Sequence, residues 1–158
     1  MPFEHTIDWT DYWTDADDAD REGASPSAQL TLDPLLAFLD ERGGVDSLAD
    51  VGCGTGTVAF ATAETYPDAT VTGYDAAAPI VEENRRRAAD RDGPTPAFEQ
   101  VTLPAFDPDR RFDAVCSFYT LCYVPEIEAA LRALYDAVAP GGALVLTYHN
   151  SLAQSHFR

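Results

Sequence analysis

The sequence contains no lysine, and its ten basic residues, all arginines, face 27 acidic residues, so that the formal net charge is −17. Such a balance argues against a nucleic-acid partner, because phosphate contacts need clustered Lys and Arg side chains. The one basic run, 85–87, is better explained as a solvated helix face paired with Glu82 and Glu83 than as a binding patch. A strongly acidic surface without lysine is typical of halophilic proteins, with an acidic mesophilic protein as the alternative. We therefore expect folding to require high salt.

Cysteines and long apolar runs are also scarce. Cys53, Cys116 and Cys122 are an odd number and lack a C-x-x-C spacing, so we expect neither a disulfide framework nor a metal site. No apolar run approaches the ~20 residues of a membrane span, and the N-terminus has no signal-peptide pattern. We expect no membrane partner and a cytoplasmic location. The length of 158 residues and the hydrophobic fraction of 46% suit one domain.

The most informative feature is a glycine-rich segment at 48–57 that is followed by the segment 71–75. The pattern predicts a strand, a tight turn, a helix and a second strand that ends in the carboxylate of Asp75. These elements form half of a mononucleotide-binding βαβ unit. Glycines allow the backbone to turn sharply and to approach a ligand closely, and a carboxylate at the second strand end can accept both hydroxyls of a ribose.

Two spacings compete within the glycine segment. From Gly54 it satisfies the loose dinucleotide pattern G-x-G-x-x-G/A, whereas from Asp50 it is D-x-G-x-G-x-G. A carboxylate at this place would repel a pyrophosphate and attract an ammonium or sulfonium group. The pattern therefore favours a cationic nucleoside, and an NAD-dependent oxidoreductase is the weaker alternative.

Further segments follow in a characteristic order, namely LPAF at 103–106, RFDAV at 111–115, LCYVP at 121–125 and VAPGGALVL at 138–146. With them the chain resembles class I S-adenosylmethionine-dependent methyltransferases of the small-domain type, over about residues 30 to 150. The resemblance implies methyl transfer from S-adenosylmethionine to a small-molecule acceptor, with S-adenosylhomocysteine as the product. A cofactor-binding protein without catalysis is a further alternative.

The resemblance also implies a set of cofactor contacts. Asp50 would meet the amino group of the methionine moiety, Asp75 the ribose, and Ala76 the adenine. The residue beside the adenine amine is open, because counting back from LPAF indicates Glu99 while the apolar Val101 favours Gln100, which we prefer. The complete set of expected cofactor contacts is Asp50, Gly52, Cys53, Gly54, Gly56, Asp75, Ala76, Gln100, Val101, Ser117 and Phe118.

A general base is needed only if the acceptor is a poor nucleophile. Tyr119 and His149 are the weak candidates, and a lone His at a strand end is more often simply exposed. The segment 117–120 lacks the N-P-P-Y pattern of amide and adenine amino-group methylation, which argues against nucleobase and glutamine acceptors.

Residues 1–26 form an acidic leader that is rich in aromatic side chains. An acidic run is usually a solvated tail, but disordered tails seldom carry two tryptophans so close together. In the resembled family such a leader often lies over the cofactor as a lid, for which Tyr12 and Trp13 are the expected contacts. Residues 27–158 would form the cofactor-binding domain.

Alternating strand and helix patterns predict an α/β fold, a doubly wound and mostly parallel sheet with helices on both faces. The right-handed crossover rule and the family resemblance together imply the order 3-2-1-4-5. We expect a first helix from Asp33 to Gly43, further helices at about 57–66, 79–90 and 125–138, and strands at about 47–51, 70–74, 97–101, 114–119 and 143–148. Family members usually continue with a helix and an antiparallel strand pair. We therefore expect a truncated chain, or a homodimer that covers the exposed edge.

Overall fold

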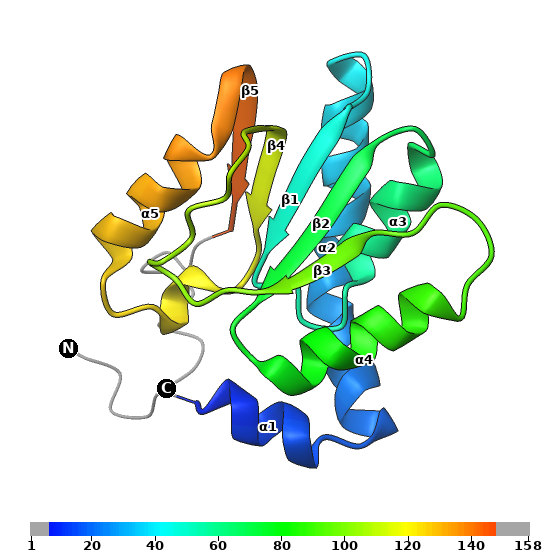
Figure 1. The fold of residues 1–158 in the computed structure, drawn as a ribbon, viewed down its shortest axis with the longest axis vertical. Helices are drawn as coiled ribbons and strands as arrows, with labels where there is room; N and C mark the ends of the chain where they lie inside the picture. Colours follow the sequence, from blue (N-terminus) through cyan, green and yellow to red (C-terminus); the bar gives the residue numbers. More distant parts are fainter. Residues whose placement is uncertain (1–6, 148–158) are drawn as a thin grey trace.

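The computed structural model describes residues 7–147, apart from the side chains of residues 23–28, and has a five-stranded parallel sheet at its centre (Figure 1). The strand order is β3-β2-β1-β4-β5, which confirms the predicted topology. The strands are β1 (Ser47–Val51), β2 (Thr70–Asp75), β3 (Ala97–Gln100), β4 (Phe112–Ser117) and β5 (Val138–Leu146).

Helices cover both faces of the sheet. They are α1 (Trp9–Asp15), α2 (Asp18–Glu41), α3 (Thr57–Thr65), α4 (Ala78–Ala89) and α5 (Ile127–Asp136), with a short 3-10 turn at Leu121–Tyr123. One core joins α2, α3 and α4 to the sheet through Leu39, Phe60 and Val81. The other joins α5 to the opposite face through Leu134 and Phe112. In Figure 1, α5 accordingly lies on one side of the sheet and α2 and α3 on the other.

The central strand β1 shows why the sheet is parallel and enclosed. All five of its residues are buried, and successive side chains enter opposite cores, Leu48 with α3 and Ala49 with α5. A strand buried on both faces needs apolar side chains in both directions. Ser47 and Asp50 are the polar residues of this run. Ser47 donates to Asp113, whereas Asp50 is an acid buried in the strand, which marks it as a residue whose burial needs a functional explanation.

The first long helix begins earlier than we predicted. It starts at Asp18 instead of Asp33, because Asp17 and Asp20 form a capping box at its N-terminus. Pro34 therefore lies inside the helix, where it lacks a donor, but Leu35 and Leu39 are buried and hold this part of α2 to the core. The helix also crosses residues 26 and 27, where the sequence indicates the end of the leader.

The fifth strand differs from the prediction at its start. It begins at Val138, five residues before the expected position, and an irregularity of the register between Phe112 and Ala114 accommodates the extra residues. A side chain at Gly142 would lie 2.7 Å from the Asp113 carbonyl, so the close approach of β5 to β4 requires glycine there. The expected strand end at residue 148 lies outside the described residues.

Two observations complete the fold. No helix among the described residues combines the length and the apolar composition of a membrane span. Within residues 7–147, the three cysteines are free and no cluster of His, Cys, Asp or Glu has an arrangement that could hold a metal.

Candidate functional site

A cavity of about 370 Å³ lies at the carboxyl ends of the central strands, the position at which α/β sheets bind ligands. The glycine loop after β1 and the segment after β4 form two walls of this cavity, and helix α1 forms a third. The lining residues that sequence analysis identified are Asp50, Gly52, Cys53, Gly54, Asp75, Ala76, Val101, Phe118, Tyr119 and Trp13.

The glycine loop has the backbone geometry that only glycine adopts readily. Gly52, Gly54 and Gly56 have φ angles of 82°, 49° and 75°. A Cβ at Gly52 would also lie 2.0 Å from the Thr120 hydroxyl, so this glycine lets the two walls meet. Gly56 lies at the start of α3, outside the cavity lining, and a Cβ there would lie 3.1 Å from the rings of Phe60 and Phe98.

Asp75 joins the end of β2 to the glycine loop. One carboxylate oxygen accepts the Gly54 N–H at 2.9 Å and the other accepts the Ala77 N–H at 3.0 Å. Burial raises the pKa of Asp75, and these backbone hydrogen bonds oppose the shift. Each carboxylate oxygen can accept more than one hydrogen bond, so the group can still receive ligand hydroxyls.

Asp50 lies deeper in the same cavity and is 3% exposed. The Cys116 thiol donates to its Oδ1 at 3.7 Å. Burial raises the pKa of Asp50 to about 7, the thiol opposes this shift, and the charge of Asp75 adds to it. Among the described residues that line the cavity there is no Lys, Arg or His. The site thus holds two buried carboxyls without a lining cation, an arrangement that favours a cationic ligand.

The segment after β3 lies beside Ala76. The Gln100 side chain donates to the Ala76 carbonyl at 3.0 Å, while Glu99 lies opposite Tyr74 in the strand register. Gln100 is therefore next to the cavity without lining it, and Val101 lines it. Thr102 and Leu103 also line the cavity and were not anticipated. The LPAF motif, which begins at Leu103, was the signal that could have indicated them.

The residues at the end of β4 diverge in direction. Ser117 is fully buried and donates to the Val51 carbonyl at 2.8 Å, so it ties β4 to β1 and does not line the cavity, whereas Phe118 does. Tyr119 also lines it, with a φ of 54°, a conformation that is unfavourable for a non-glycine residue and that is found preferentially at functional sites. The second candidate base, His149, lies outside the described residues.

Helix α1 places two aromatic side chains against the cavity. Trp13, which is 6% exposed, packs with Ala77 and Ile80, and Trp9 meets the Tyr123 ring edge-to-face at 5.0 Å. Both tryptophans line the cavity, whereas Tyr12 does not: its hydroxyl donates to the Asp20 carbonyl. Trp9, a further lining residue that sequence analysis missed, could have been found from its i, i+4 spacing to Trp13, because residues four apart share one helix face.

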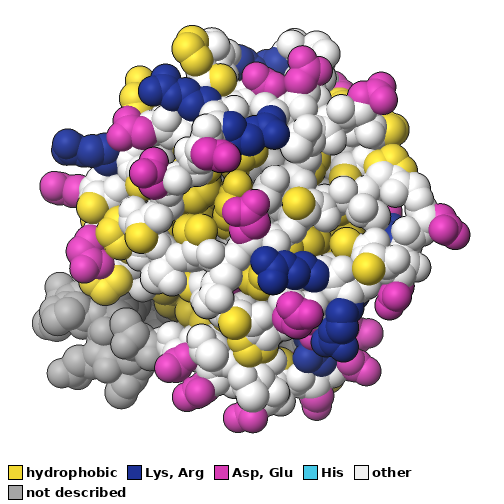
Figure 2. Space-filling model, in the orientation of Figure 1, with side chains coloured by type: hydrophobic (Ala, Val, Ile, Leu, Met, Phe, Trp, Pro, Cys, Tyr) yellow, Lys and Arg dark blue, Asp and Glu magenta, His cyan; other side chains and the backbone are white. Residues whose placement is uncertain are grey.

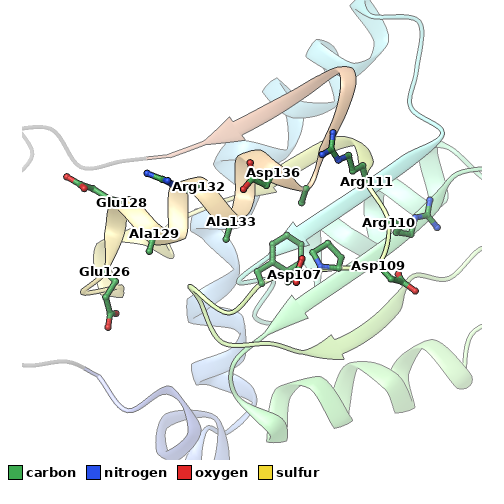
Figure 3. Close-up of a pocket in the computed structure, with 13 residues that line it drawn as sticks. Asp107, Asp109, Arg110, Arg111, Glu126, Glu128, Ala129, Arg132, Ala133 and Asp136 are labelled. Carbon is green, nitrogen blue, oxygen red and sulfur yellow. The ribbon is translucent and has the colours of Figure 1, made fainter.

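A second hollow lies away from the glycine loop, between α5 and the segment 106–111 (Figure 3). It has a volume of about 1110 Å³ and an open, mixed-charge lining that includes Asp107, Arg110, Glu128, Arg132 and Asp136. On the face shown in Figure 2, acidic side chains and arginines are interspersed in the same way. None of the predicted site residues borders this hollow, so the cavity at the glycine loop is the candidate site.

Comparison with known proteins identifies the family of the region that contains the glycine loop. Residues 49–144 match the family described as methyltransferase domain. The chain is 35% identical over 128 residues to trans-aconitate 2-methyltransferase of Streptomyces coelicolor, covering 78% of this chain and 41% of the relative. It is 36% identical over 124 residues to nocamycin O-methyltransferase of Saccharothrix syringae, covering 72% of this chain and 41% of that protein. The chain thus spans about two fifths of the length of these relatives.

Solved structures show a similar architecture. An S-adenosylmethionine-bound amino pentose methyltransferase from Micromonospora echinaspora superimposes with a TM-score of 0.60 and 30% identity, over 73% of this chain and 49% of that one. Magnesium protoporphyrin IX methyltransferase from Synechocystis superimposes with a TM-score of 0.69 over 90% of this chain and 69% of its own, at 23% identity, which supports the fold alone.

Proposed function

The chain belongs to the methyltransferase domain family, and on this premise we propose that it binds S-adenosylmethionine and transfers the methyl group to a small-molecule acceptor. The product of the cofactor would be S-adenosylhomocysteine. The relatives and the solved structures that the chain resembles are methyltransferases, which supports this activity over the alternatives.

The observation that carries the proposal is the pair of buried carboxyls at the ends of two adjacent strands. Asp50 and Asp75 are 3% and 8% exposed, and Asp75 is bonded to the glycine loop. A buried carboxylate is stable only when it is paired, and S-adenosylmethionine brings an ammonium and a sulfonium group. A dinucleotide would instead bring two negative phosphates to the glycine loop beside Asp50, so NAD fits this cavity poorly, although Asp75 would suit the ribose of either ligand.

The predicted contacts that line or adjoin the cavity have the following places in this arrangement. Asp75 would hold the ribose hydroxyls, and Asp50 the ammonium group, directly or through water. Ala76 and Val101 would contact the adenine, with Gln100 beside its amine and Phe118 near the methionine portion. Trp9 and Trp13 would cover the bound cofactor, so that α1 acts as a lid.

When bound, the cofactor supplies an already electrophilic methyl group, so the protein mainly needs to orient an acceptor and exclude water. Orientation alone can contribute on the order of 7 to 11 kcal/mol. Phe118, Tyr123 and Trp9 form an apolar and aromatic wall of the cavity, which would limit access of water once the cofactor is bound. Tyr119 would assist proton removal only for an acceptor that is protonated at working pH.

A small molecule is the acceptor class that the observations favour. The names of two relatives specify trans-aconitate and nocamycin as their methylated compounds. Arg85 and Arg87 donate to backbone carbonyls of neighbouring segments, which leaves the basic run poorly suited to phosphate binding.

A cytoplasmic location is supported by the three free cysteines, since reducing compartments keep thiols free. A homodimer would cover the edge strand β5, whose residues are partly or fully exposed.

Calorimetric titration with S-adenosylmethionine, S-adenosylhomocysteine and NAD in molar KCl tests the proposal. We expect the first two to bind and NAD not to bind. Binding of NAD alone would overturn the assignment. Methyl transfer from labelled cofactor to a panel of small acceptors, starting with trans-aconitate, then separates an enzyme from a protein that binds the cofactor without catalysis.

A further inference from the structure

Two side chains of α4 hold two successive carbonyls of the glycine loop. Asn84 donates from Nδ2 to the Gly54 carbonyl at 2.7 Å, and Arg87 donates from Nη1 to the Thr55 carbonyl at 2.5 Å. The same Arg87 nitrogen donates to Asn84 Oδ1 at 3.0 Å. The two side chains, three residues apart on one helix face, therefore form a linked clamp on the loop.

The clamp is built into the packing between α4 and α3. Asn84 is fully buried, and both polar atoms of its amide are bonded. The Arg87 guanidinium also lies 4.8 Å from the centre of the Phe60 ring, which orders a side chain that would otherwise be flexible. Removing Arg87 would leave the Thr55 carbonyl without its side-chain donor, and removing Asn84 would leave the Gly54 carbonyl with only the Cys53 thiol at 3.9 Å.

The direction of these carbonyls determines which backbone N–H groups of the loop point away from α4. In a planar trans peptide the C=O and the following N–H point in opposite directions. Because the Gly54 carbonyl points to α4, the Thr55 N–H points away from that helix. The neighbouring Gly54 N–H donates to Asp75. Gly54 and Thr55 line the cavity, whereas Asn84 and Arg87 do not.

We propose that Asn84 and Arg87 are positioning residues for the cofactor: Asn84 fixes the peptide between Gly54 and Thr55, and Arg87 fixes the peptide between Thr55 and Gly56. Their effect on affinity rests on the proposed function, since the loop is taken to bind S-adenosylmethionine. Their effect on the loop itself does not, because the hydrogen bonds are present without a ligand. The two effects can be measured separately.

Arg87→Ala tests the clamp, with Arg86→Ala as the matched control that removes the same charge from the adjacent exposed position of α4. We expect Arg87→Ala to weaken S-adenosylhomocysteine binding on the order of tenfold in calorimetry. In the ligand-free protein we expect faster amide hydrogen exchange by NMR at Gly54 and Gly56, whose N–H groups donate to Asp75 and to the Cys53 carbonyl. Arg86→Ala should leave both values as in the unmodified protein. Arg87→Lys, which keeps a donor for the carbonyl, should recover part of the affinity.

Asn84→Asp is the second variant, because it keeps the shape of the side chain and replaces the donor with an acceptor. It should weaken binding more than Arg87→Ala; if it fails to fold, the arginine variants decide the question. Equal affinity and equal exchange rates in Arg87→Ala and Arg86→Ala would overturn the clamp. If the unmodified protein does not bind S-adenosylhomocysteine, the proposed function fails, and the exchange rates alone still test the clamp.

Discussion

The Asp75 carboxylate accepts the Gly54 N–H at 2.9 Å, and this hydrogen bond joins the end of β2 to the glycine loop. The other carboxylate oxygen accepts the Ala77 N–H at 3.0 Å, at the start of α4. Asp75 thus shapes the site as well as presenting a charge to it. A substitution here removes both contributions.

We expect Asp75→Ala to lower the affinity for S-adenosylhomocysteine by roughly 100-fold or more, because hydrogen bonds to a charged group contribute about 1.5–3 kcal/mol each. Calorimetry measures this change. Asp68→Ala is the control, since it removes an acid from an exposed turn that precedes β2, at the opposite end of this strand from Asp75. Similar affinities for the two variants would exclude Asp75 as a ribose contact.

The raised pKa of Asp50 predicts how stability depends on pH. Its ordinary value is 3.8 and its value in the ligand-free protein is about 7. Between these values the folded state binds more protons than the unfolded state, so the free energy of unfolding falls as pH rises through this range. The contribution is complete below pH ~4 and is lost above pH ~7, to a total of about 4 kcal/mol at most. Asp75, whose pKa is also raised by burial, changes stability in the same direction.

Denaturant unfolding of the ligand-free protein across this range measures the effect. Asp50→Asn should flatten the pH profile and should unfold at higher denaturant than the unmodified protein above pH 7. A cationic ligand stabilises the carboxylate, so binding of S-adenosylmethionine near pH 6 should release protons, which calorimetry in two buffers of different ionisation heat detects. A profile that is the same in Asp50→Asn would contradict the assignment.

Tryptophan fluorescence should report ligand binding directly. The chain has two tryptophans, Trp9 and Trp13, and both line the cavity. A ligand that enters beneath α1 changes their surroundings, so we expect titration with S-adenosylhomocysteine to shift or quench the emission. Trp9→Phe should reduce the signal. An unchanged spectrum at calorimetric saturation would show that α1 is not a lid.

The two glycines with similar backbone angles should differ in their tolerance of a side chain. Gly52 and Gly43 have φ angles of 82° and 91°, but a Cβ at Gly52 would lie 2.0 Å from the Thr120 hydroxyl, whereas Gly43 has open space. Both alanine variants carry the strain of positive φ, on the order of 1 kcal/mol. Gly52→Ala should lose further stability and cofactor affinity, which thermal unfolding and calorimetry measure. Equal melting temperatures would show that the loop can move away from Thr120.

Salt should stabilise this protein. The acidic side chains that give the net charge of −17 repel one another at low ionic strength, and no lysine is present to balance them. We expect the melting temperature to rise between salt-free buffer and molar KCl. A temperature that does not change would indicate an acidic mesophilic protein.

Much of the fold could be predicted from the sequence, because its signals are local. β1 was predicted to the residue, since a short apolar run before a glycine turn has few alternatives. The start of α2 was not predicted, because the capping box at Asp17 and Asp20 competes with another N-terminal signal at Asp33. The early start of β5 depends on a register irregularity with β4, which no local pattern reveals.

The sequence by itself determined the glycine loop, the two acids and the strand order, because motif spacing, the crossover rule and the family resemblance place them without reference to distant contacts. Only the tertiary structure decided where the side chains point. Packing directed Ser117 to the Val51 carbonyl, brought Trp9 over the cavity and set Asn84 and Arg87 on the loop. These outcomes depend on contacts between segments far apart in the chain, whose relative positions are set by burying the two cores together.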